Sequence, residues 1–169
     1  MDHGIDWLNS LSVERAEQEF LKCCGSLRWA GNMAKRRPFA ELGDLIAESD
    51  RIWWSLNKED WLEAFRSHPK IGEKKAEKTQ SADAKAWSEQ EQSGTRESPD
   101  ETMTALAAAN EAYANRFGYI FIICATGKTA DEMLASLQER LRHSPDEEVR
   151  IAAEEQNKIT KLRLGKLIN

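Results

Sequence analysis

The stretch SPDETMTALAAANEAYANRFG, residues 98–118, is the part of the chain that indicates its fold most directly. Ser98 can cap a helix, Pro99 fits the first helical position, and Glu101 can complete a capping box. Gly118 suits the left-handed conformation that often ends a helix. Between these signals, apolar and small polar residues recur every three or four positions, which predicts one buried stripe. The stripe consists of Met103, Leu106, Asn110, Tyr113 and Phe117.

The same helix-start signals recur further along the chain. Ser144 to Glu147 repeats the tetrapeptide Ser-Pro-Asp-Glu, and Thr129 to Glu132 offers another capping box. Each start is followed by a helical stripe. After Thr129 the stripe is Met133, Leu134, Leu137 and Leu141; after Pro145 it is Val149, Ala152, Gln156, Ile159, Arg163 and Leu167.

The first half of the chain is less regular, but it also has helical signals. Four helices are predicted here: Leu11 to Cys24, Phe39 to Trp54, Lys58 to Ser67, and Ser81 to Gln92. Ser12 can cap the first, and Asn57 can cap the third, which has Asp60 at its third position. Ser81 can cap the fourth, and Gly94 stops it. Tyr119 to Cys124 is apolar and β-like, but no second strand is available to pair with it, so we expect an extended connection. The chain is therefore predicted to form a single all-α domain over residues 1–169, a helical bundle.

Composition narrows the class of protein. The chain has 169 residues, 40% hydrophobic and 31% charged, as expected for one globular domain. A formal charge of −5 argues against nucleic acid as a partner. Three cysteines without a CxxC pair favour a reducing compartment, and no segment resembles a signal peptide or a membrane span. We therefore expect a cytoplasmic enzyme or binding protein.

His68 is the first residue with a chemical signal. Pro69 disfavours the helical conformation at the residue before it, so the preceding helix should end near His68. A helix C-terminus raises the pKa of an imidazole, and burial lowers it, so such a histidine can exchange a proton near neutral pH. A histidine that only caps helix carbonyls is the commoner case, and His-Pro alone leaves both roles open.

Two further polar features stand out. Ser88, Glu91 and Gln92 share one face of a predicted helix, where they can bind a urea-like molecule or simply face solvent. Arg163 lies on a stripe that should be buried. A buried guanidinium is costly, so we expect an anion to bind it. That anion can be a buried glutamate or a substrate carboxylate, and the sequence leaves both open. Asn110 is expected to bond backbone in the core.

Other chemistries have little support. The sequence has no glycine-rich phosphate loop, no GxSxG motif and no metal-like spacing of His3, His68 and His143. Cys124, in a run of Ile and Phe, fits a buried apolar site better than a nucleophile.

Four segments in order resemble one family, OHCU decarboxylase, where OHCU is 2-oxo-4-hydroxy-4-carboxy-5-ureidoimidazoline. They are FRSHP from Phe65, SEQEQSG from Ser88, NEAYANRFGYIFIICA from Asn110 and KLRL from Lys161. The similarity extends from about Leu11 to Leu167. It departs from the family's usual pattern at Lys70, where an acidic residue commonly follows His-Pro.

The resemblance implies an all-helical homodimer, without metal or organic cofactor, that converts OHCU to (S)-allantoin and CO2 in urate breakdown. It implies that His68 is the proton donor and that Glu91 acts with it. The substrate-binding positions that it implies are Pro69, Ser88, Glu89, Gln90, Glu91, Gln92, Phe121, Ile122, Ile123, Cys124, Ala125 and Arg163. Because the run from Phe121 to Ala125 has no strand partner, its backbone groups are expected to be free for a ligand.

Two other functions remain in competition. A helical interaction module would use the Trp-rich first half as a docking surface. A ureide hydrolase would need a metal or a nucleophile, for which the sequence offers no candidate.

Overall fold

The computed structural model describes residues 4–69, 82–95 and 99–169, and within them every regular element is a helix. The all-α prediction is therefore confirmed. The elements are α1 (Gly4–Ser10), α2 (Val13–Cys23), α3 (Leu27–Lys35), α4 (Leu42–Ser55), α5 (Lys58–Phe65), α6 (Ala82–Glu91), a short 3-10 helix η1 (Ser93–Thr95), α7 (Asp100–Phe117), α8 (Ala130–Arg140) and α9 (Pro145–Ile168).

The chain divides into two compact units, which are described separately. Unit 1 comprises Met1–Ala64 and Asn157–Asn169, and unit 2 comprises Phe65–Gln156. That residues 1–169 act as a single domain stays a prediction.

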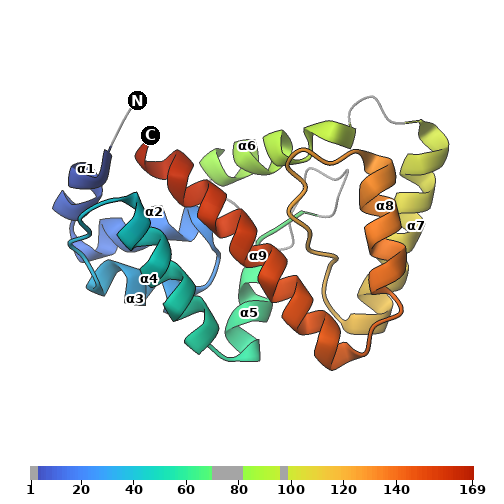
Figure 1. Ribbon diagram of the computed structural model, residues 1–169, viewed down its shortest axis with the longest axis horizontal. Coiled ribbons are helices and arrows are strands. Elements are labelled where there is room, and N and C mark those ends of the chain that lie inside the picture. Colours follow the sequence, from blue (N-terminus) through green and yellow to red (C-terminus); the bar gives the residue numbers. More distant parts are fainter. Residues whose placement is uncertain (1–3, 70–81, 96–98) are drawn as a thin grey trace. The chain divides into compact units, whose positions relative to one another are not determined.

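Unit 1 has an aromatic core. In it α2 packs against α3, and α3 packs against α4 (Figure 1). The ring of Phe20 meets Trp29 edge-on at 5.8 Å between ring centroids, and Phe39 at 6.5 Å. The buried indole N–H of Trp29 donates to Ser49 Oγ at 3.2 Å, so burying this large side chain leaves no polar atom unsatisfied.

None of the six tryptophans is fully exposed. Trp29 and Trp53 are buried, and the other four are only partly accessible. The interaction-module hypothesis uses the Trp-rich first half as its docking surface, and burial removes Trp29 and Trp53 from any such surface.

Unit 2 is built on α7 and α8, which pack side by side (Figure 1). The chain between them is extended, and Phe121, Ile123 and Ala125 contribute to the same core because alternate residues of an extended segment share a side. The predicted connection without a strand is confirmed. The core cluster is Leu106, Tyr113, Phe121, Ile123, Ala125, Ala130, Met133 and Leu137.

Several predicted helix signals are confirmed. Ser12 Oγ accepts from the Arg15 N–H, and Thr129 forms a complete capping box with Glu132. The Asn57 side chain accepts from the Asp60 N–H while Asp60 accepts from the Asn57 N–H. Ser144 Oγ accepts from the Glu147 N–H at 3.3 Å, and Gly118 has φ of 85°. Local side-chain chemistry therefore sets these helix ends.

Other boundaries differ from the prediction. α7 begins at Asp100, with Pro99 outside it in an extended conformation, while Ser98 and Ser81 lie outside the described residues. α5 ends at Phe65 rather than Ser67, because the His68 N–H closes a turn on the Phe65 carbonyl before Pro69. α4 starts at Leu42 rather than Phe39.

Helices α1 and α3 were not predicted. Both are short, at 7 and 9 residues, so neither carries enough turns to show a periodic stripe. α3 is nevertheless capped by Ser26, whose hydroxyl accepts from the Trp29 N–H at 3.2 Å.

Candidate active site

His68 is buried and bound to a side chain of α9. It is 8% exposed, and its Nε2 lies 2.6 Å from Oε1 of Gln156, which is 0% exposed. Since an amide oxygen only accepts, Nε2 carries a proton in this bond. Pro69, the next residue, is also buried. His68 therefore does more than cap the carbonyls of α5: its ring is held by a residue 88 positions away.

The polar residues of α6 divide into buried and exposed ones. Ser88 is 4% exposed and Glu91 7%, one turn apart on one face. Glu89 and Gln90 are exposed, and Gln92, just after the helix, is half-buried. Glu89 and Gln90 therefore face solvent, whereas Ser88 and Glu91 do not. A buried hydroxyl and carboxylate on one face are suited to bind a polar ligand.

The segment Phe121 to Ala125 is held by one side chain of α8 and one of α9. Arg140 Nη1 donates to the Ile122 carbonyl at 2.6 Å, and the Cys124 N–H donates to Glu155 Oε1 at 3.0 Å. The expectation that the backbone groups of this segment are free is therefore wrong at Ile122 and Cys124. The reason is that a mostly buried extended segment without a partner strand still needs hydrogen bonds, and side chains supply them here.

Glu91 lies near this segment. Burial is the main cause that raises the pKa of the Cys124 thiol, and the carboxylates of Glu155 and Glu91 raise it further. The thiol is therefore protonated at neutral pH, which supports the interpretation of Cys124 as a packed residue rather than a nucleophile.

A close backbone approach connects α6 to the same region. A Cβ built on Gly94, in η1, would lie 2.0 Å from the Lys128 carbonyl oxygen. Only glycine allows the backbone after α6 to pack so closely on the turn that follows residues 121–125. Gly94 therefore helps to place Glu91 against the segment, a role beyond the helix stop that the sequence predicted.

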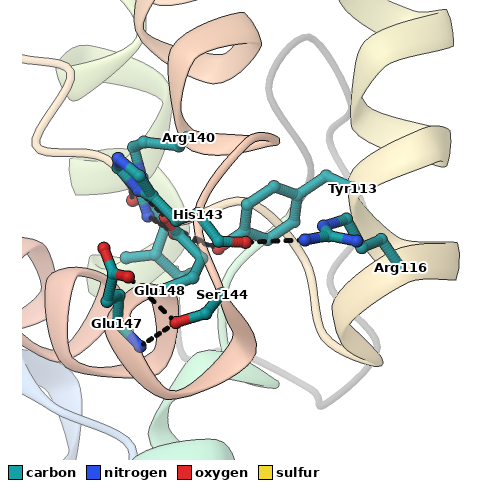
Figure 2. A network of polar contacts seen from close by, with 8 residues as sticks. Tyr113, Arg116, Arg140, His143, Ser144, Glu147 and Glu148 are labelled. Atoms are coloured by element: carbon teal, nitrogen blue, oxygen red, sulfur yellow. Dashed lines mark hydrogen bonds and ion pairs between the residues drawn. The ribbon is translucent and has the colours of Figure 1, made fainter.

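A buried charge network links α7, α8 and α9 in unit 2. Figure 2 shows Tyr113, Arg140 and His143 converging on Glu148, which is fully buried. Arg140 Nη2 lies 2.6 Å from Glu148 Oε2, the Tyr113 hydroxyl donates to the same oxygen, and His143 Nδ1 lies 3.1 Å from Oε1. Burial raises the pKa of Tyr113, so its hydroxyl stays protonated as a donor. The network satisfies both buried charges.

Arg140 links this network to the candidate ligand segment. Besides its bonds to Glu148 and the Ile122 carbonyl, its guanidinium lies 4.4 Å from the centroid of the Phe121 ring. A guanidinium with several fixed partners holds the segment rigidly.

Arg140, Glu148 and Glu155 are polar core residues that were not predicted from the sequence. Helical periodicity could have indicated that Arg140 is buried, because it lies on the same face of α8 as Met133 and Leu137, one turn further along. Gln156 was placed on the buried stripe of its helix, but no partner was predicted for it. Hydrophobic periodicity does not mark buried charged residues, because it registers them as solvent-facing.

Arg163 and Asn110 match their predicted environments. Arg163 lies in unit 1, 2% exposed, with Nη1 3.5 Å from the Lys22 carbonyl oxygen. Its burial is confirmed, whereas the choice between a protein partner and a substrate anion stays open. Asn110 is buried in unit 2 and its amide donates to the Leu106 carbonyl at 3.0 Å, as predicted.

The described residues contain neither a candidate membrane-spanning helix nor a candidate metal site. Among residues 4–69, 82–95 and 99–169, no helix is long and apolar enough to cross a bilayer. Nor does this part of the chain gather three or more His, Cys, Asp or Glu side chains in a way that could hold a metal ion.

Comparison with known proteins relates this chain to one family. The family model described as OHCU decarboxylase matches residues 9–165. The chain is 32% identical over 138 residues to 2-oxo-4-hydroxy-4-carboxy-5-ureidoimidazoline decarboxylase of Haloferax volcanii, covering 81% of this chain and 79% of that one. It is 32% identical over 167 residues to the protein of the same name from Amia calva, covering 95% and 92%.

A longer relative matches over part of its length. The chain is 38% identical over 160 residues to the uric acid degradation bifunctional protein TTL of Arabidopsis thaliana, and this match covers 94% of the chain but 49% of the relative. The chain thus spans about half the length of that bifunctional protein.

Solved structures support the same assignment. A crystal structure of OHCU decarboxylase in the presence of (S)-allantoin matches with a TM-score of 0.76 and 39% identity, covering 89% of this chain and 96% of that one. An (S)-allantoin synthase, at 20% identity and a TM-score of 0.73, covers 98% of this chain and 54% of its own and shows the shared fold. The family predicted from the sequence is confirmed: the chain belongs to the OHCU decarboxylase family, a family of decarboxylases of urate degradation.

Proposed function

We propose that this chain removes the carboxylate of OHCU as CO2 and forms (S)-allantoin, without a metal or organic cofactor. The observation that carries the proposal is the burial of His68, Ser88 and Glu91 in one compact unit of a chain that matches the family over residues 9–165. Buried groups able to donate and accept protons are costly unless they are used or bonded, and they are typical of active sites.

The reaction needs little from the protein beyond orientation and one proton. When the carbon–carbon bond to the carboxylate breaks, its electron pair stays on the imidazoline ring and is delocalised by the conjugated ring system. His68, protonated, gives its proton to a ring carbon on one face, which sets the configuration of the product. Solvent then returns one proton to His68, so each turnover consumes one proton and releases one CO2.

The remaining site residues would bind and orient the substrate. Glu91 and Ser88 would accept and donate hydrogen bonds to its hydroxyl and ureido groups, together with Gln92. Pro69 and the backbone of Phe121 to Ala125 would form the wall of the site, through the groups that Arg140 and Glu155 do not engage. Arg163 would bind an anionic or carbonyl group of the substrate. Glu89 and Gln90, which are exposed, would contribute at most through the backbone of α6.

The assembly and location of the protein are part of the same proposal. We expect one domain over residues 1–169 that forms a homodimer in the cytoplasm, where the three free cysteines stay reduced. Sedimentation equilibrium of the purified chain tests the dimer: a mass near 19.2 kDa, that of one chain, would contradict it.

A direct assay tests the activity. Freshly prepared OHCU mixed with the purified chain should give optically active allantoin, followed by circular dichroism, faster than the spontaneous reaction. CO2 release should match allantoin in a one-to-one ratio. Racemic allantoin formed at the spontaneous rate would overturn the proposed function.

A further inference from the structure

The bond between His68 and Gln156 suggests a role for Gln156 that the sequence did not indicate. We propose that Gln156 is a positioning residue: its Oε1 accepts the Nε2–H of His68 and assigns the proton that reaches the substrate to Nδ1. The inference rests on the proposed function, since it concerns the proton that His68 would donate. The carrying observation is the 2.6 Å distance between two side chains that are 8% and 0% exposed.

The amide oxygen selects one form of the ring. The neutral imidazole has one N–H, and it can donate to Gln156 only as the Nε2–H tautomer. The imidazolium carries both N–H groups and keeps the same bond. The ring can therefore lose and regain a proton at Nδ1 while its orientation stays fixed, which is what repeated proton donation to one face of a substrate requires.

A neutral partner also suits a proton donor. A carboxylate in this place would favour the imidazolium and make it a weaker acid. An amide oxygen orients the ring without adding a charge. A histidine bound in this way can give up its proton more readily near neutral pH.

The position of Gln156 on α9 makes it a rigid support. The preceding residue, Glu155, accepts the Cys124 N–H at 3.0 Å. Two consecutive residues of one helix therefore fix the proton donor and the segment proposed to line the ligand. A small displacement of Gln156 would move His68 relative to that segment.

Nitrogen NMR of the wild-type chain labelled with ¹⁵N-histidine tests the tautomer without any change to Gln156. His68→Asn identifies the His68 signals among the three histidines. At a pH where His68 is neutral, we expect a protonated Nε2 and an unprotonated Nδ1. The opposite tautomer would overturn the inference, even in a chain that decarboxylates OHCU at full rate.

Substitutions at Gln156 test the consequence for catalysis. The protonated donor is active below its pKa, and activity falls as the pH rises through that pKa. Gln156→Glu places a carboxylate beside the ring, so the alkaline fall in kcat should move up by about one pH unit or more, with a lower plateau. Gln156→Met keeps the length but removes the acceptor, so kcat should fall about tenfold with little change in KM, and the alkaline fall should move to lower pH.

Gln138→Glu is the matched control, because it makes the same change of charge at an exposed position of α8. It should leave the pH profile unchanged. If Gln156→Glu gives the same profile as Gln138→Glu, the positioning role is wrong. A wild-type chain that fails to accelerate the reaction contradicts the proposed function instead, and the NMR tautomer then still decides whether Gln156 orients His68.

Discussion

Two histidines of unit 2 bond to α9 in opposite ways. His143 Nδ1 lies 3.1 Å from a carboxylate oxygen of Glu148, and its side chain is 25% exposed. His68 Nε2 lies 2.6 Å from the amide oxygen of Gln156, and the residue is 8% exposed. Of these two bonds, the one made by the better-buried histidine is to a neutral amide, and the one made by the more accessible histidine is to a carboxylate.

The difference reflects what each histidine contributes. Glu148 also binds Arg140 and Tyr113, so its carboxylate serves a charge network that anchors the core of unit 2 (Figure 2). His143 is a peripheral member of that network. Gln156 binds His68 through a neutral amide oxygen, which suits a group that is proposed to release a proton. The carboxylate of Glu148 therefore belongs to a stabilising network, whereas the amide of Gln156 binds the proposed proton donor.

The most severe test of this comparison removes His68. His68→Asn should reduce the enzymatic acceleration of OHCU decarboxylation by about 100- to 10,000-fold, the usual contribution of a positioned acid or base. The measurement is the initial rate of formation of optically active allantoin, with far-ultraviolet circular dichroism to check that helical content is retained. A variant that keeps the full rate would show that His68 is not the proton donor.

The second test concerns the charged partner of His143. Glu148→Gln should lower the free energy of unfolding by about 3–5 kcal/mol, because the buried guanidinium of Arg140 loses its counter-charge. Urea unfolding measured by circular dichroism gives this value. Glu147→Gln, at the neighbouring exposed position, is the control and should cost less than about 1 kcal/mol. Equal effects of the two substitutions would contradict a structural role for the network.

A third test asks whether α6 takes part in the chemistry beside His68. Glu91→Gln should lower kcat/KM about 10- to 100-fold, since a hydrogen bond to a charged group contributes about 1.5–3 kcal/mol. Steady-state kinetics of the variant measure the loss. Glu139→Gln, an equivalent change at an exposed position of α8, should leave kcat/KM unchanged. Similar kinetics for the two variants would remove Glu91 from the site.

Much of the fold could be predicted because its signals are local. The Thr129 box and the Gly118 helix end depend on residues within one turn of each other. The buried face of α9, including Arg163, followed from helical periodicity. Short helices such as α1 carry too few turns for this argument.

The candidate site was harder to predict because its supports come from distant parts of the chain. Gln156 is 88 positions from His68, and Glu155 is 31 positions from Cys124. Periodicity could place Gln156 on a buried face, but it could not name the ring nitrogen that this side chain binds. The expectation of free backbone at Ile122 and Cys124 failed for the same reason, since their partners are side chains on other helices.

The smallest expected effect comes from the second histidine. His143→Asn should cost less than about 1 kcal/mol of unfolding free energy, because the side chain is 25% exposed and Glu148 keeps Arg140 and Tyr113 as partners. It should leave the rate of OHCU decarboxylation unchanged. The same urea titration and allantoin assay used for the other variants measure both quantities. If this substitution impaired catalysis as much as His68→Asn, the division between a structural histidine on a carboxylate and a chemical histidine on an amide would be wrong. If it instead left catalysis intact and removed several kcal/mol, His143 would be a full member of the network, and the division between the two histidines would become sharper.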